Sequence, residues 1–173
     1  MFYEQFCVLC APMQIERITL DNLSRVIALF ASNPDYFSCV QSHPIDENEC
    51  RADITMLPPG KTLADKTYVL VSDAQGDFAV IDFVERYPDD QTGYLGFLIL
   101  SGSRQRSGLG TILLSKIEQA AKVCGLSRLE LGCYETNESG MAFWKALGFS
   151  PIRTSEQKTD GIVYSIVSME KNI

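Results

Sequence analysis

Hydrophobic patterns divide the second half of the chain into a regular order of elements. An apolar run from Tyr94 to Leu100 predicts a strand, which leads into a glycine turn at residues 105–110. Apolar residues then recur at helical spacing from Thr111 to Cys124, and Gly125 ends that pattern. Leu129 to Cys133 alternates apolar and polar residues, as a half-buried strand does. The expected order is therefore strand, glycine turn, helix, strand.

A second helix and two more strands are predicted after this unit. Asn137 is a favourable N-cap, and the apolar residues that follow it at helical spacing are Met141, Trp144 and Leu147. Gly148 ends the helical pattern. Residues 150–153 and 162–169 are expected to close the sheet.

The first half of the chain begins with a strand and a helix. Residues 14–20 predict the first strand, although their pattern is mixed. Asp21 is expected to cap a helix that ends near Asn33 and Pro34, with an apolar face made of Leu23, Val26, Ile27 and Phe30. Residues 36–40 predict a short second helix.

The next segment has an ambiguous pattern, and a hairpin follows it. Residues 46–57 fit neither a helix nor a strand clearly. Residues 67–72 and 78–85 predict two strands of a hairpin, with the turn at residues 73–77. Strands followed by alternating helices and strands predict an α/β fold, with a mixed sheet and helices on both of its faces.

Length and composition indicate one domain. The chain has 173 residues, of which 46% are hydrophobic, and this is enough for one sizeable core. Met13 would be a sensible start directly on the first strand. Residues 1–12 are therefore predicted to be a dispensable N-terminal extension, and residues 13–173 to be the domain.

Charge and hydropathy exclude several kinds of partner. The formal net charge of −7 disfavours binding to nucleic acid, since no basic patch offsets it. No apolar run approaches the ~20 residues of a membrane span. The first 12 residues contain Glu4 and no basic residue, so they make a poor signal peptide. We expect a cytoplasmic protein without a nucleic-acid or membrane partner.

The cysteine pattern predicts free thiols and no metal site. Cys7 and Cys10 form a single C-x-x-C pair without a second pair at ligand spacing, and the one histidine, His43, is far away in sequence. Cys39, Cys124 and Cys133 lie in apolar patterns and are expected to be small core residues.

The glycine turn is the strongest candidate binding site. Its sequence, Gln105-Arg106-Ser107-Gly108-Leu109-Gly110, lies between a predicted strand and the start of a helix. Unpaired N–H groups and the positive end of a helix meet at such a turn and favour an anion, most simply a pyrophosphate. Glycine allows a backbone to approach phosphate oxygens and to adopt positive φ. Arg104 and Arg106 add positive charge.

At this point the motifs resemble a known family. The spacing Leu98-x-Leu100, Gln105-x-x-Gly108-x-Gly110, Asn137 and Phe143-Trp144-Lys145-Ala146-Leu147-Gly148-Phe149 is similar to the acetyl-CoA-binding half of the GNAT N-acetyltransferase superfamily. The similarity covers residues 94–149 and is fainter upstream. It implies a single-domain GNAT fold around a central, mostly antiparallel sheet, and acetyl-CoA as co-substrate.

The resemblance also implies which residues hold acetyl-CoA. The main chain of Leu98 and Leu100 would pair with pantetheine like an extra strand. A backbone N–H near Leu98 would donate to the thioester oxygen. The other residues implied in cofactor binding are Gln105, Arg106, Ser107, Gly108, Leu109, Gly110, Thr111, Asn137 and Trp144.

The general base is not evident from the family pattern. Many members carry an acidic residue early in the strand before the glycine turn, where this chain has Tyr94 and Gly96. The neighbouring strand offers Asp82, within an apolar run, and Glu85, at its end, as candidates. Burial of an unpaired carboxylate is costly, so a carboxylate in such a run is expected to have a catalytic or structural role. The structural alternative is that Asp82 makes a hydrogen bond across the sheet while Glu85 is solvated.

The acid that protonates the leaving thiolate also departs from the pattern. Many relatives have a tyrosine on the last helix where this chain has Trp144, whose indole donates a hydrogen bond but no proton. Tyr134 is the nearest replacement. The alternatives are protonation by water and departure of an unassisted thiolate.

The activity that the resemblance implies is direct transfer of an acetyl group from acetyl-CoA to a primary amine of a small molecule or peptide. A catalytically silent acyl-CoA sensor is the main alternative, since both usual proton-handling positions are altered. A dinucleotide-binding fold is disfavoured because Leu113 occupies the position of its third glycine. A homodimer is also considered, because many relatives are dimers.

Overall fold

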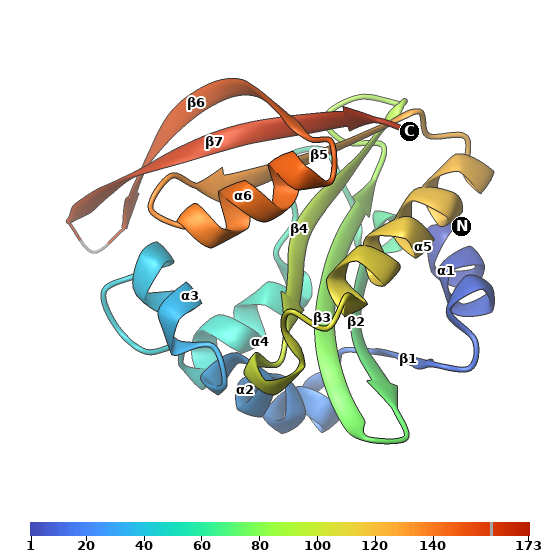
Figure 1. Cartoon of the computed structure of the whole chain (residues 1–173), viewed down its shortest axis with the longest axis horizontal. Coiled ribbons are helices and arrows are strands. Elements are labelled where there is room, and N and C mark those ends of the chain that lie inside the picture. The colour runs from blue at the N-terminus through green and yellow to red at the C-terminus, as the bar shows by residue number, and fades with distance from the viewer. Residues whose placement is uncertain (160) are drawn as a thin grey trace.

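The computed structural model describes residues 1–159 and 161–173, and within them the strands form one seven-stranded sheet (Figure 1). The strand order is β1-β2-β3-β4-β5-β7-β6. β4 and β5 are parallel, and the other neighbouring strands are antiparallel. The bounds are β1 Gln14–Arg17, β2 Lys66–Asp73, β3 Gly76–Glu85, β4 Thr92–Leu100, β5 Arg128–Tyr134, β6 Ser150–Thr159 and β7 Ile162–Asn172.

Helices cover both faces of this sheet and enclose two separate apolar cores. The α-helices are α1 Phe2–Cys10, α2 Leu23–Ala31, α3 Pro34–Val40, α4 Glu47–Thr55, α5 Leu109–Val123 and α6 Glu138–Ala146, and the short 3-10 helices are η1 Leu20–Asn22, η2 Leu63–Asp65 and η3 Gly102–Arg104. One core lies between the sheet and α1, α5 and α6, and the other between the sheet and α2, α3 and α4. Figure 1 shows α1 beside α5, with α2, α3 and α4 together on another side of the molecule. The predicted mixed sheet with helices on both faces is confirmed.

The start of α2 differs from the prediction. Strand β1 ends at Arg17, and the single turn η1 separates it from α2. The Thr19 hydroxyl accepts from the N–H of Asp21 at 3.2 Å, and the side chain of Asn22 accepts from the N–H of Thr19 at 2.9 Å. The prediction that Asp21 caps the helix is therefore wrong, because this local capping box satisfies the turn two residues earlier.

Two further segments have more structure than their patterns indicated. The undecided residues 46–57 contain α4, and Asp46 and Glu49 form a reciprocal capping box at its start. Strand β6 extends to Thr159 rather than ending at Arg153. Almost the whole of β6 is exposed, so no apolar alternation could reveal its length, and only its pairing with β7 defines it.

The first residues of the chain form a helix in the core. The side chains of Phe2 and Phe6 are fully buried, and the ring of Phe2 stacks on Phe83 with 3.9 Å between centroids. Residues 1–12 had been expected to be a dispensable extension. Whether they can be removed stays a prediction, but this burial leads us to expect that their removal destabilises the domain.

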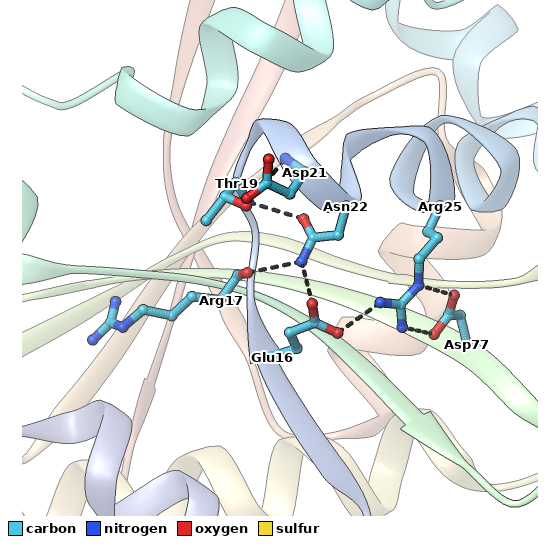
Figure 2. Close-up of polar contacts among 7 residues, drawn as sticks. All are labelled: Glu16, Arg17, Thr19, Asp21, Asn22, Arg25 and Asp77. Atoms are coloured by element: carbon cyan, nitrogen blue, oxygen red, sulfur yellow. Dashed lines mark hydrogen bonds and ion pairs between the residues drawn. The ribbon is translucent and has the colours of Figure 1, made fainter.

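A polar network fixes α2 to the edge of the sheet (Figure 2). The guanidinium of Arg25 binds both carboxylate oxygens of Asp77, at 2.8 and 2.6 Å, and donates to Glu16 at 2.6 Å. Asn22 donates to Glu16 at 2.8 Å and to the carbonyl of Arg17 at 2.9 Å. The network thus joins β1, the start of α2 and the β2–β3 hairpin.

Candidate active site

Strands β4 and β5 separate in the middle of the sheet. Their parallel pairing runs from Thr92 with Arg128 to Leu95 with Leu131. Beyond this point β4 pairs with β3 as far as Leu100, and β5 pairs with β7 as far as Tyr134. Within the described chain, the two edges that face each other after Leu95 and Leu131 have no strand partner. An extended ligand can therefore hydrogen-bond to backbone groups in this gap.

The glycine loop lies at the end of β4 and starts α5. Gly108 is the N-cap of α5 and has φ +83°, a conformation that favours glycine. No atom lies within 4 Å of the position that a Cβ on Gly108 would occupy. The first N–H groups of α5 have no acceptor within the helix, so the loop presents free donors to open space.

The second glycine of the loop serves packing between helices. Gly110 is buried, and a Cβ there would come within 3.1 Å of the ring of Phe143 on α6. Gly110 allows α5 to approach α6, and Gly108 is the glycine at the open surface. That both glycines allow the backbone to approach phosphate stays a prediction.

The charged and polar side chains of the loop have different partners. Gln105 Nε2 donates to Asn33 Oδ1 at 2.5 Å, and Ser107 Oγ donates to the carbonyl of Arg104 at 2.5 Å. Arg104 forms an ion pair with Asp73 at 2.6 Å. Arg106 is exposed and has no hydrogen bond or ion pair to the described residues. Of the two arginines, Arg106 is the one available to a phosphate.

The remaining predicted cofactor residues lie on β4, on the first turn of α5, and on α6 and its N-cap. Leu98 and Leu100 are half-buried against the core that contains α5, together with Leu109 and Trp144, while Thr111 is exposed. Asn137 caps α6, as predicted, because its Oδ1 accepts from the N–H of Gly140 at 3.0 Å. Trp144 contacts Phe143 and Phe149 edge-on, at centroid distances of 4.9 and 5.4 Å.

Asp82 lies buried beside the point where β4 leaves β5. The register of β3 and β4 shifts between Asp82 and Phe83, so that Gly96 has no partner opposite it. Gly96 is exposed, and a Cβ there would lie 3.0 Å from Oδ2 of Asp82. The missing side chain of Gly96 therefore leaves an opening onto a carboxylate whose residue is 8% exposed.

A small polar cluster surrounds Asp82 on this face of the sheet. Lys66 Nζ lies 2.9 Å from Asp82 Oδ2, and Tyr68 is paired directly opposite Asp82 on β2. Asp82 Oδ1 and Tyr68 Oη are buried and have no hydrogen-bond partner in the described structure. Burial raises the pKa of Asp82, and the charge of Lys66 opposes that shift. Burial also raises the pKa of Asp53, on α4, to about 6.

Glu85 lies on the opposite face of the sheet from Asp82. Side chains alternate along β3, and those of Phe83 and Glu85 point toward α1. The carboxylate of Glu85 accepts from the N–H of Phe2 at 2.9 Å, which caps the start of α1. The structure therefore does not bring the two candidate bases together, and it gives Glu85 a structural partner.

Tyr134 lies on β5 beyond the last residue paired with β4. Its ring packs in the same core as Phe97 and contacts Tyr164 edge-on, with 5.7 Å between centroids. Burial raises the pKa of the Tyr134 hydroxyl. The phenol is thus on the same face of the sheet as Asp82 and stays protonated at neutral pH.

Sequence reasoning missed Lys66, Tyr68 and Asp53. Lys66 is the first residue of β2, one position before the predicted strand, and an isolated lysine at a strand end is usually solvated. Asp53 lies in the segment whose pattern was undecided. The signal that could have found Lys66 was Asp82 itself, because a carboxylate in an apolar strand needs a buried partner.

Comparison of the sequence with models of protein families identifies the family of this chain. The model for the acetyltransferase (GNAT) family matches residues 29–149, which includes β4, the glycine loop, α5, β5 and α6. The chain belongs to the GNAT acetyltransferase family. This family uses acetyl-CoA, and the predicted family and co-substrate are confirmed.

Solved structures share the same GNAT fold at low sequence identity. An acetyltransferase from Thermus thermophilus has a TM-score of 0.72 and 20% identity, with 93% of this chain and 97% of that chain covered. PaiA N-acetyltransferase from Thermoplasma acidophilum, solved in complex with coenzyme A, has a TM-score of 0.66 and 17% identity, with 93% and 99% covered. The ribosomal-protein-S18-alanine N-acetyltransferase from Escherichia coli has a TM-score of 0.65 and 15% identity, with 93% and 94% covered.

Three other observations complete the description of this GNAT domain. No curated protein sequence matches the chain significantly. Among residues 1–159 and 161–173, no helix is long and apolar enough to cross a membrane, and no cluster of His, Cys, Asp and Glu side chains could hold a metal ion. All six cysteines are free thiols.

Proposed function

We propose that this protein is an acetyl-CoA-dependent N-acetyltransferase that acts on a primary amine of a small molecule or peptide, with Asp82 as the general base. Membership of the GNAT family supports the acetyl donor. The opening at Gly96 supports the base, because it places the buried carboxylate beside the gap between β4 and β5. This opening is the observation on which the proposal rests.

The residues that would hold acetyl-CoA fit an extended, negatively charged molecule. The free edge of β4 from Gly96 to Leu100 offers backbone groups to pantetheine, and the start of α5 offers N–H groups to the pyrophosphate. The Arg106 side chain adds a positive charge at the exposed loop. Bound acetyl-CoA supplies the acetyl group as an activated thioester.

In the proposed reaction Asp82 and Tyr134 handle the protons. Asp82 takes a proton from the acceptor's ammonium group, which frees the nitrogen lone pair for attack on the thioester carbonyl. A C–N bond forms and the C–S bond breaks, and the nitrogen releases its second proton to water as the amide forms. The thiolate receives a proton from water, or from Tyr134, which then regains one from water. Tyr134 suits this role because it is protonated and lies on the same face as Asp82.

A thiol-release screen tests the function. Acetyl-CoA is supplied with amino acids, polyamines, aminoglycosides or peptide N-termini, and free thiol is measured together with the mass of the acetylated product. We expect release that depends on one class of amine. Binding of acetyl-CoA without release on any amine would instead favour an acyl-CoA sensor.

Asp82→Asn tests the base with the acceptor that the screen identifies. The amide keeps the shape of the carboxylate but has no basicity, so turnover should fall by about 10²- to 10⁴-fold while affinity for acetyl-CoA is kept. Glu85→Gln is the matched control on the same strand, since its side chain points toward α1. Unchanged turnover in Asp82→Asn would move the role of base to another group.

A further inference from the structure

A buried ion pair supports the carboxylate to which we assign the role of base. Lys66 Nζ lies 2.9 Å from Asp82 Oδ2, and the two side chains are 4% and 12% exposed. The same ammonium donates to the carbonyl of Met56 at 2.9 Å and lies 5.1 Å from the ring centroid of Tyr68. Contacts from the end of α4 and from two strands therefore hold Lys66 in one place.

The stability of the fold alone does not explain why a charged pair is buried at this position. A charged pair taken out of water is often no more stabilising than apolar side chains of similar volume, whereas one buried charge left alone is costly. Asp82 also lies beside the opening at Gly96, where an arriving molecule can reach it. The pair thus places a carboxylate with a cationic partner beside the exposed Gly96, next to the gap between β4 and β5.

We infer that Lys66 is a positioning residue of the acetyl-transfer site, which keeps Asp82 ionised and holds Oδ2 at the opening left by Gly96. The inference rests on the proposed function. The other titratable groups that interact with Asp82 are Tyr68 from β2, Asp53 from α4 and Tyr94 from β4, and Cys50 from α4 lies next to Tyr68 and Asp53. All of these are neutral or acidic, so Lys66 is the cation of the cluster.

Removal of this cation leaves the effect of burial unopposed. Burial disfavours the charged form of a carboxyl group, and a nearby positive charge lowers its pKa by about 1 to 3 units. Without Lys66, Asp82 would hold its proton to higher pH. The base would then be inactive at neutral pH and would recover activity in alkaline solution.

The pH dependence of kcat/KM in Lys66→Met tests this role. We expect the acidic limb to move up by about 1 to 3 pH units, with the rate at pH 7 reduced at least about tenfold and largely restored near pH 9. KM for acetyl-CoA should stay unchanged. Lys66→Arg keeps the charge, so its acidic limb should stay near that of the parent protein.

Lys61→Met is the matched control variant. Lys61 also pairs with an aspartate, Asp65, at 3.4 Å and donates to a backbone carbonyl, that of Arg86, at 3.2 Å. Its partners are not members of the cluster around Asp82. Lys61→Met should therefore leave the acidic limb in place, and an equal shift in both variants would contradict a specific role for Lys66.

A second readout is independent of any acceptor. The titration of the Asp82 carboxyl carbon is followed by ¹³C NMR in the parent protein and in Lys66→Met, with Asp82→Asn to assign the signal. We expect the pKa of Asp82 to be higher in Lys66→Met. If no amine is acetylated, the proposed function fails while this measurement still decides the effect of Lys66.

An unchanged titration of Asp82 in folded Lys66→Met, with folding checked by circular dichroism, would overturn the inference. If Lys66→Met does not fold, Lys66→Gln takes its place, because the amide can still donate to Asp82 and to the carbonyl of Met56 without carrying a charge. The same shift is expected in that variant, and its absence would equally overturn the inference.

Discussion

The side chain of Gln105 donates a hydrogen bond of 2.5 Å to Asn33 Oδ1, which joins the glycine loop to the end of α2. Asn33 is itself buried and donates to the carbonyl of Leu29 at 3.0 Å. A second bond of 2.9 Å, from the N–H of Gly102 to Ser32 Oγ, reinforces the contact. The loop that we propose to bind acetyl-CoA is thereby held by residues at the end of α2, the helix that packs on the other face of the sheet.

Loss of this contact should weaken acetyl-CoA binding. In Gln105→Ala and in Asn33→Ala the loop loses its hydrogen bond to the end of α2. We expect KM for acetyl-CoA to rise about 3- to 10-fold, which corresponds to the free energy of one hydrogen bond. A double-mutant cycle should show that the two effects are not additive. Ser38→Ala, which removes a hydrogen bond on the exposed side of α3, is the control and should leave KM unchanged.

Gly108→Val should abolish acetyl-CoA binding. Valine resists positive φ, and its side chain would occupy the open space in which phosphate oxygens are expected. Gly125→Val is the control, because Gly125 has φ +78° and equally open surroundings at the other end of α5. Calorimetric titration with acetyl-CoA should show loss of affinity in the first variant alone. Parental affinity in a folded Gly108→Val protein would refute the assignment of the loop.

Phe6→Ala should destabilise the domain strongly. The ring is fully buried in the core between α1 and the sheet, and its removal leaves a cavity that costs about 3 to 5 kcal/mol. Val8 lies on the same helix and is 74% exposed, so Val8→Ala should cost far less. Urea unfolding measures both. A Phe6→Ala protein as stable as Val8→Ala would restore the view that residues 1–12 are dispensable.

Asp53→Asn should stabilise the protein at neutral and alkaline pH. Burial raises the pKa of Asp53 from 3.8 to about 6, so ionisation of this group in the folded state costs free energy. The parent protein should therefore lose stability relative to Asp53→Asn as pH rises from about 4 to 6. The full difference corresponds to about 3 kcal/mol above pH 6.

The difference in Tm between Asp53→Asn and the parent, measured at pH 4, 5, 6, 7 and 8, tests this expectation. Asp90→Asn is the control, since Asp90 lies exposed in a turn and its side chain has no partner in the described structure. A Tm difference for Asp53→Asn that stays constant over this range would show that Asp53 titrates like an exposed carboxyl.

The order of elements was predictable because periodicity and turn residues are local signals. The unit from Tyr94 to Phe149 has strong periodicity in both helices, with glycines before α5 and after both helices and the N-cap Asn137 before α6, and it folds as expected. Strand β6 shows the opposite case, since its residues are exposed on an edge and carry no burial pattern. Helix α1 was missed because its burial depends on α5, about one hundred residues later.

The candidate site was predictable only in the parts that depend on local backbone conformation. The glycine loop, the N-cap Asn137 and the strand with Leu98 have sequence signals, because the local chain conformation requires them. The polar cluster has no local signal, since Lys66 meets Asp82 only through the pairing of β2 with β3. Alternation along β3 could have separated Asp82 from Glu85, but the partner of Glu85 in α1 depends on tertiary packing.

The separation of β4 and β5 has a consequence for the handling of this protein. Edge strands are usually found at the borders of a sheet, where charge or covering elements prevent them from pairing with another chain. Here two such edges lie within the sheet, and one of them carries the apolar run Phe97-Leu98-Ile99-Leu100. In the absence of ligand, this gap is a template for strand addition and hence for aggregation. A molecule that fills it acts as a protective strand, so the shelf life of the purified protein and its occupancy by coenzyme A should rise together.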